Sequence, residues 1–225
     1  GAVQAARWSN TVDTDPIDGG GYVYSFNGPH SLFVDTIRSM RILDVSHDLG
    51  HVLMGEFDAK INLLGRSIKH GLTTSKYIVF YGSTEHTYDV RGRTAHEAIF
   101  NRNDGRFRCR STQQGYSPFS TWTRGLSWAI LGYAEQLEFL AKRSDAEIKQ
   151  ACGLTKKQVI REYEKAAKAT CDHYIKDVTA SDGITYWDDG APNLHKLGDW
   201  QNAPADPYND HEPVDSTASA ISAQG

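Results

Sequence analysis

The chain has 225 residues, of which 39% are hydrophobic and 23% are charged, a globular balance that argues against intrinsic disorder. A formal net charge of −4 provides no basic field to neutralise phosphates, so nucleic-acid binding is not expected. No stretch of roughly 18 uncharged apolar residues predicts a membrane span. Cys109, Cys152 and Cys171 include no CxxC pair, which predicts reduced thiols rather than a disulfide framework.

Apolar spacing predicts four main helices, over residues 31–47, 56–69, 120–142 and 155–176. The first is apolar on almost all sides, whereas the second carries a single stripe formed by Phe57, Ile61, Leu64 and Ile68. Thr155 is the expected N-cap of the fourth. Alternation of an almost wholly apolar helix with amphipathic ones suits two concentric layers of helices.

Shorter features complete the predicted organisation. Segments 21–24, 77–81 and 184–187 resemble strands, and the Asp-, Asn-, Pro- and Gly-rich stretch 188–213 predicts one long loop. Residues 1–6 resemble the end of a helix, and residues 215–225 the beginning of another. Both ends are therefore expected to be the ends of a fragment. No signal peptide pattern is visible, and the sequence assigns no compartment or oligomeric state.

Asp35 is the first candidate catalytic residue because it interrupts an otherwise apolar helical pattern. Burial of a carboxyl group favours its protonated form, which a general acid needs near neutral pH. The alternative is structural: Asp35 lies four residues after the expected cap at Ser31, where an acid also compensates the helix dipole.

A second candidate site lies at the start of the third predicted helix, where a Gly-, Ser- and Pro-rich loop precedes Trp122. Arg124 and Trp128 are spaced i, i+4 and so share a helix face. An arginine beside an aromatic ring can pair with a uronate carboxylate while the indole stacks on the sugar. A cation–π pair inside the core is the structural alternative.

The histidines do not predict a metal site. The nine include no HExxH motif and no paired ligand spacing, and neither a phosphate-binding glycine loop nor a GxSxG elbow occurs. No metal or cofactor is therefore predicted. His86, in the polar segment 83–89, is a candidate for hydrogen bonding to a ligand or to solvent.

Four segments together resemble the unsaturated glucuronyl hydrolases and the related unsaturated rhamnogalacturonyl hydrolases. They are Phe33-Val34-Asp35-Thr36-Ile37-Arg38-Ser39-Met40, the segment 83–88, the run from Gln114-Gly115-Tyr116-Ser117 to Thr121-Trp122-Thr123-Arg124-Gly125-Leu126-Ser127-Trp128-Ala129-Ile130, and the pair Tyr186-Trp187-Asp188 and Asp215-Ser216-Thr217-Ala218. The third is the most specific. The segments follow the family's order and span most of the chain.

The resemblance implies an all-α fold, an (α/α)6 toroid that is incomplete at both ends here, with residues 1–225 forming one fragment of a catalytic domain. It implies an oligosaccharide substrate whose terminal uronate carries a C4=C5 double bond. Asp35 would be the general acid and base, and His86 and Gln114 would orient water and sugar. Arg124, Trp128 and Trp187 would bind substrate.

Two departures from the family pattern leave alternatives open. The separation between His86 and Gln114 is longer than the family pattern, which makes His96 a substitute for His86. No counterpart of the family's second, upstream aspartate precedes Asp35, as would suit a non-catalytic carbohydrate-binding relative. A polysaccharide lyase or an ordinary glycosidase on a similar helical toroid is the other alternative.

Overall fold

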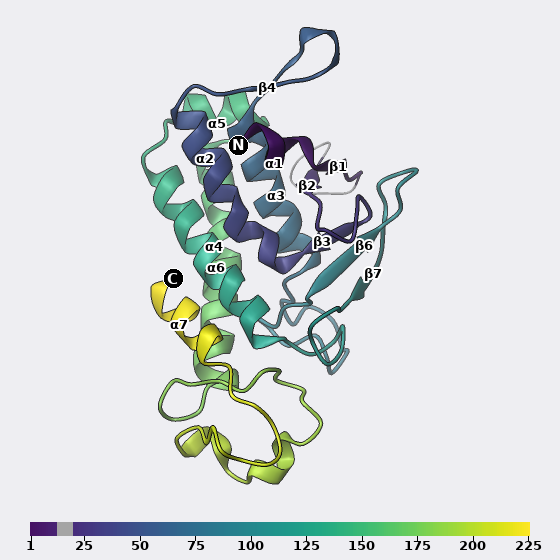
Figure 1. Cartoon of the computed structure of the whole chain (residues 1–225). Helices are drawn as coiled ribbons and strands as arrows, with labels where there is room; N and C mark the ends of the chain where they lie inside the picture. Colours follow the sequence, from purple (N-terminus) through teal and green to yellow (C-terminus); the bar gives the residue numbers. More distant parts are fainter. Residues whose placement is uncertain (13–19) are drawn as a thin grey trace.

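The computed structural model describes residues 1–12 and 20–225 of the chain, and most of its regular structure is helical (Figure 1). The α-helices are α1 Ala2–Ala6, α2 Met40–Asp48, α3 Leu63–Tyr77, α4 Thr123–Ala141, α5 Asp145–Cys152, α6 Lys156–His173 and α7 Ser216–Gln224. Shorter turns are the 3-10 helices η1 Val34–Ser39, η2 Glu56–Asp58, η4 Leu194–Leu197 and η5 Trp200–Asn202, and the π-helical η3 Tyr174–Val178.

Three small antiparallel sheets accompany the helices. The strands are β1 Trp8–Asn10, β2 Gly21–Val23, β3 Ser31–Phe33, β4 Leu53–Met54, β5 Lys60–Ile61, β6 Glu97–Phe100 and β7 Phe107–Ser111. β1 pairs with β2 and β4 with β5, whereas β3, β6 and β7 form a three-stranded sheet beside the helices (Figure 1). Phe33 lies opposite Glu97 in this sheet, so the chain around His96 runs alongside the start of η1.

The core is centred on α4, which packs against η1, α6 and α7, while α3 packs against α2, α5 and α6. Tyr133 and Tyr163 are fully buried between these helices. Their hydroxyl groups donate to the carbonyl oxygens of Gly71, at 2.9 Å, and Ile68, at 3.0 Å. These bonds satisfy the polar end of each ring, so both aromatic side chains can lie in the interior at little cost.

The predicted helix over 31–47 is wrong at its beginning. Ser31–Phe33 is strand β3, η1 follows, and α-helical geometry begins at Met40. The apolar residues at this end are buried by pairing with β6, a long-range contact that local periodicity does not report. Asp35 therefore lies in the first turn of a 3-10 helix, and not inside an α-helix.

The predicted helix over 56–69 is also displaced. Phe57 has a positive φ of 56° and is 99% exposed, so it does not belong to the buried stripe. The helix begins after Asn62, whose side chain accepts a bond from the Gly65 N–H, and it continues to Tyr77. Its continuation overlaps the predicted strand at 77–81, where only an isolated bridge between Val79 and Thr94 forms.

Most of the other predicted elements are confirmed, but the predicted strand over 184–187 is not. The helices over 120–142 and 155–176 correspond to α4 and α6, and Thr155 forms a capping box with Gln158. Strand β2 lies within 21–24, whereas 184–187 makes isolated bridges only. The stretch 188–213 is a long loop with two 3-10 turns, seen below the helices in Figure 1. Helix α5 and the β6–β7 hairpin were not predicted.

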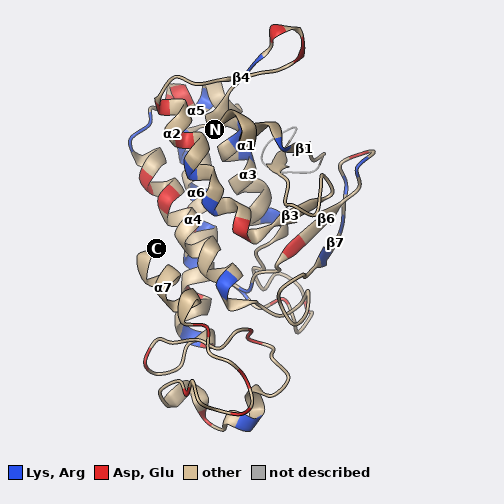
Figure 2. Cartoon of the chain, in the orientation of Figure 1, with Lys and Arg blue, Asp and Glu red and all other residues tan. Residues whose placement is uncertain are grey.

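All three cysteines are free. Within residues 1–12 and 20–225, none of the helices combines the length and the apolar character that crossing a membrane requires. Charged side chains are spread over the helices and loops, with both signs on α2, α4, α5 and α6, only basic residues on α3 and none on α7 (Figure 2).

Candidate functional site

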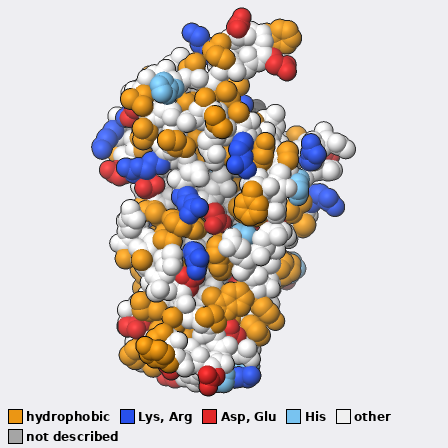
Figure 3. Space-filling model, in the orientation of Figure 1, with side chains coloured by type: hydrophobic (Ala, Val, Ile, Leu, Met, Phe, Trp, Pro, Cys, Tyr) orange, Lys and Arg blue, Asp and Glu red, His pale blue; other side chains and the backbone are white. Residues whose placement is uncertain are grey.

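Asp35 lines a cavity of about 370 Å³ between η1, the segment after β2 and the turn before α4. Other residues that line it are Arg7, Tyr24, Phe26, Arg38 and Gln114. The space-filling view shows acidic, basic and hydrophobic side chains meeting near the middle of one face (Figure 3). This combination of an acid, two cations and aromatic rings in one concave place is typical of a site that binds a polar ligand.

The carboxylate of Asp35 faces the imidazole of His96. Oδ2 of Asp35 lies 3.4 Å from Nε2 of His96, and their side chains are 18% and 1% exposed. Neither atom has a hydrogen-bond partner among the described residues. A distance of 3.4 Å is longer than an ordinary N–H···O bond, so a small movement of either side chain would complete the contact.

Neighbouring groups determine the orientation and the tautomer of His96. Nδ1 accepts a bond from the backbone N–H of Gln113 at 2.9 Å, so in the neutral ring the proton is on Nε2, which faces Asp35. The ring packs between Phe33, at a centroid distance of 4.4 Å, and Trp122, at 5.1 Å. His96 can therefore present one N–H to the carboxylate in a fixed direction.

The turn that carries Gln114 is held by a buried acid from the long loop. Oδ2 of Asp188 accepts the N–H of Tyr116 at 2.8 Å, and burial raises the pKa of Asp188. Gly115 fits closely here: an added Cβ would lie 2.8 Å from Oγ1 of Thr112. These contacts explain why a glycine follows Gln114, since a larger residue at position 115 would displace the turn.

Glu97, the neighbour of His96, has a structural environment. Its carboxylate accepts bonds from Ser31 Oγ at 2.5 Å, Asn27 Nδ2 at 3.1 Å and Gln113 Nε2 at 3.2 Å. Burial acts to raise its pKa, but the hydrogen bonds from these side chains together lower it. Glu97 is thus kept ionised while it ties β3 and the Gln113 turn to β6.

Two arginines line the same cavity as Asp35. The guanidinium of Arg7 lies 5.2 Å from the centroid of the Tyr24 ring, and that of Arg38 lies 4.1 Å from the centroid of the Trp128 indole. Phe26, 78% exposed at the cavity, makes an edge contact with Phe33 at 5.1 Å. Trp128 thus reaches the site through Arg38.

Arg124 is placed differently from the expectation. Its Nε and Nη2 both lie 3.0 Å from Oδ2 of Asp215, whose side chain is 3% exposed. Asp215 also caps α7 by accepting the Ala218 N–H at 2.9 Å. The pair connects α4 to α7 and occupies the Nε and Nη2 edge of the Arg124 guanidinium.

The two remaining predicted site residues lie outside the Asp35 cavity. His86 stacks on Tyr88, with ring centroids 5.0 Å apart, and lines a separate cavity of about 150 Å³. Trp187 donates from Nε1 to Glu212 at 2.6 Å, a bond that closes the long loop. The structure brings Gln114 to Asp35, and it brings His96 there in place of His86.

Sequence reasoning did not single out Arg7, Tyr24, Phe26 or Arg38. Arg38 was visible in the segment with Asp35, three residues later in the chain, but its spacing alone indicated no role. Arg7 and Phe26 come from separate short segments and carried no sequence signal. Among residues 1–12 and 20–225, no group of three or more His, Cys, Asp and Glu side chains is arranged to hold a metal ion.

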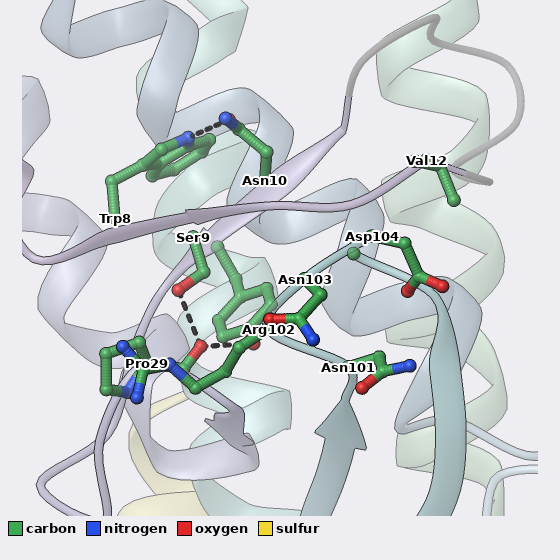
Figure 4. A pocket seen from close by; sticks show the side chains of 11 residues that line it. Trp8, Ser9, Asn10, Val12, Pro29, Asn101, Arg102, Asn103 and Asp104 are labelled. Atoms are coloured by element: carbon green, nitrogen blue, oxygen red, sulfur yellow. Dashed lines mark hydrogen bonds between the residues drawn. The ribbon is translucent and has the colours of Figure 1, made fainter.

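A larger cavity of about 450 Å³ lies between β1 and the β6–β7 turn (Figure 4). Trp8 Nε1 donates to Asn10 Oδ1 at 2.8 Å, and Ser9 Oγ donates to the Pro29 carbonyl at 2.6 Å. Its described lining includes no histidine, and its only acid is the exposed Asp104. The Asp35 cavity is therefore the better candidate for acid–base chemistry.

Solved structures of unsaturated glucuronyl hydrolases are similar to this chain in fold. The enzyme of Bacillus sp. GL1, responsible for the degradation of glycosaminoglycan, is 21% identical over 88% of this chain and 39% of its own, with a TM-score of 0.55. A UGL variant with dGlcA-Glc-Rha-Glc is 21% identical over 98% of this chain and 45% of its own, with a TM-score of 0.58. The enzyme of Streptococcus agalactiae is 16% identical over 87% of this chain and 36% of its own, with a TM-score of 0.55.

The likeness to this family inferred from the sequence is thus confirmed at the level of the fold. The chain spans less than half the length of each of these three structures. No protein-family model matches the chain, and no curated protein matches it.

Proposed function

We propose that the chain is part of a glycoside hydrolase that removes unsaturated uronic acid from the non-reducing end of oligosaccharides released by polysaccharide lyases. The chain would supply part of an (α/α)6 toroid, with residues 1–225 in one catalytic domain. The observation that carries the proposal is the carboxylate of Asp35, which lies in a concave site with an N–H of His96 directed at its unbonded oxygen.

Asp35 would act first as acid and then as base. The protonated carboxyl group donates its proton to C4 of the C4=C5 double bond, and positive charge develops at C5 beside the ring oxygen. The Asp35 carboxylate then accepts a proton from a water molecule whose oxygen bonds to C5. One water is added, and Asp35 regains its starting protonation. The hemiketal at C5 opens to a ketone, and the aglycone leaves from C1.

His96 would be a positioning residue in this scheme. Its Nε2–H, fixed by the Gln113 N–H on the other ring nitrogen, directs the Asp35 carboxylate and stabilises it after the proton has left. Gln114 lines the same cavity and offers an amide that could orient the water or a sugar hydroxyl. His96 thus takes the role that the family resemblance gave to His86.

The composition of the cavity favours hydration over ordinary glycoside hydrolysis. Ordinary glycosidases use two carboxyl groups on opposite sides of the scissile bond. Asp35 is the one acidic residue among the described residues that line this cavity. Hydration of a double bond needs a single group that gives and takes a proton. Similar structures that carry dGlcA-Glc-Rha-Glc and dGlcA-GalNAc6S support an oligosaccharide substrate of this kind.

The test follows the ultraviolet absorbance of the conjugated C4=C5 uronate in lyase-generated disaccharides. The chain should remove this absorbance, and Asp35→Asn should reduce the rate at least about 100-fold, the usual scale of lost acid–base catalysis. The matched control is Asp48→Asn, which replaces an exposed acid of α2 and should leave the rate unchanged. A rise in absorbance on intact polymer would instead identify a lyase, and equal rates with Asp35→Asn would refute the role of Asp35.

His96 is tested by two substitutions in the same assay. His96→Ala should lower the rate and change its pH profile, because the proton-exchanging carboxyl group loses the N–H donor that faces it. His96→Gln, which can keep an N–H near Asp35, should restore part of the rate. If both variants lower the rate equally with an unchanged pH profile, His96 has only a packing role.

A further inference from the structure

The cationic part of the Asp35 cavity is not explained by packing alone. Arg7 and Arg38 both line it, and neither guanidinium forms an ion pair with an acid among the described residues. Most other arginines near the helices are paired: Arg41 contacts Glu135 at 3.0 Å, and Arg143 contacts Asp48 at 2.7 Å. Two unpaired cations beside a single carboxylate make this cavity suited to an anion.

Both guanidinium groups are held by aromatic rings. Arg38 extends from η1 to the Trp128 indole of α4 at 4.1 Å, and Arg7, at the end of α1, lies over Tyr24 at 5.2 Å. Stacking uses the flat face of a guanidinium and leaves its N–H edge available. An arginine restrained in this way loses less conformational entropy when it binds a carboxylate or sulfate.

The proposed chemistry also requires a countercharge. After proton transfer Asp35 is negative, and a uronate in the same cavity is negative too, so the two repel each other. Arg124 was expected to bind the uronate, but its Nε and Nη2 already bind Asp215. Arg7 and Arg38 are the cations that remain in the cavity lining.

We propose that Arg7 and Arg38 bind an oxyanion of the sugar and so select acidic oligosaccharides at the Asp35 cavity. This inference rests on the proposed function for the identity of the sugar. The oxyanion can be the uronate carboxylate or a sulfate on the adjoining sugar, since both present planar or tetrahedral oxygens to a guanidinium edge.

The experiment measures equilibrium binding by titration calorimetry, in an Asp35→Asn background so that the ligand is not consumed. The probes are an unsaturated glucuronate–N-acetylgalactosamine disaccharide, its 6-sulfated form, and the methyl ester of the unsulfated form. Arg7→Gln and Arg38→Gln are compared with Arg41→Gln, whose arginine lies in α2 outside this cavity. Circular dichroism checks that each variant is folded.

Each cavity variant should weaken binding of an acidic probe about tenfold, the scale of one lost charge-assisted hydrogen bond, and more salt should weaken wild-type binding. Arg41→Gln should bind as the parent does. Loss for the unsulfated acid but not for its methyl ester identifies the carboxylate, whereas loss for the sulfated probe alone identifies the sulfate. The same loss for all three probes, unchanged affinity in both variants, or no binding of any acidic probe to the folded chain would overturn the inference.

The outcomes separate the inference from the proposed function. Charge-dependent binding that requires Arg7 and Arg38, without any loss of C4=C5 absorbance in the chain with Asp35 intact, would leave the anion site standing and refute the hydrolase. Hydrolysis with an unchanged KM in Arg7→Gln and Arg38→Gln would support the hydrolase and refute the anion site.

Discussion

Asp44 provides a quantitative prediction about stability. It is 1% exposed within α2, accepts a bond from Nε2 of Gln136 on α4, and leaves Oδ1 buried without a partner among the described residues. Burial raises the pKa of Asp44 from 3.8 to about 6, while bonds from Ser67 and Gln136 oppose part of that rise. The folded protein therefore holds the Asp44 proton more tightly than the unfolded chain does.

The sign of the pH dependence follows from this difference. The protonated form contributes its full stability below the unfolded pKa of 3.8, and that contribution is lost as the pH rises towards about 6. Each pH unit between the two values changes the free energy of unfolding by about 1.4 kcal/mol, so the total loss is about 3 kcal/mol. The substitution Asp44→Asn places an uncharged amide at this position and avoids the loss.

Asp44→Asn should therefore match the parent near the acid end and be more stable by up to about 3 kcal/mol above the folded pKa. Urea unfolding followed by circular dichroism over this pH range measures the difference. Asp48→Asn, on the same helix but 41% exposed, should show a much smaller change across the range, because its ion pair with Arg143 is exposed and its charge adds only the smallest part of the rise in the pKa of Asp44. A gap between Asp44→Asn and the parent that does not grow with pH would refute the burial argument.

Two further substitutions test contacts of α4. Gly132→Ala should destabilise the fold by about 1–3 kcal/mol, because the new Cβ would lie 2.5 Å from Cγ2 of Ile37. This is the opposite of the usual effect of Ala in place of Gly in a helix. A raised melting temperature would contradict this packing. Asp215→Ala should lower the stability by about 1–3 kcal/mol, because it removes both the α7 cap and the partner of Arg124. Asp215→Asn should retain the cap and lose less stability in thermal unfolding. Equal losses of stability in the two variants would assign the whole effect to the ion pair.

Local pattern determined the helices whose signals are contained within the element. α4 and α6 have long apolar stripes, and Thr155 with Gln158 supplies a cap that requires no distant partner. The long loop 188–213 could be predicted for the same reason, because Gly, Pro, Asn and Asp act on the backbone near them. The segment motifs also indicated the fold to which the chain is similar.

The β3–β6 pairing could not be predicted in this way. Ser31–Phe33 is apolar enough for a helix, and only its contact with Glu97–Phe100, far away in the sequence, makes it a strand. The same pairing brings His96 next to Asp35, while His86, in the segment that resembles the family loop, lies in another cavity. A motif identifies a residue type and a chain neighbourhood, but a site is formed by residues that meet in space.

The arginines show the same division. The sequence by itself determined that Arg124 and Trp128 share a helix face, since that follows from 3.6 residues per turn. Only the tertiary structure decided that Arg124 pairs with Asp215 and that Arg38 lies over Trp128. Periodicity fixes which side chains share a face of one helix, whereas the partner of each charge depends on which other elements pack against that face.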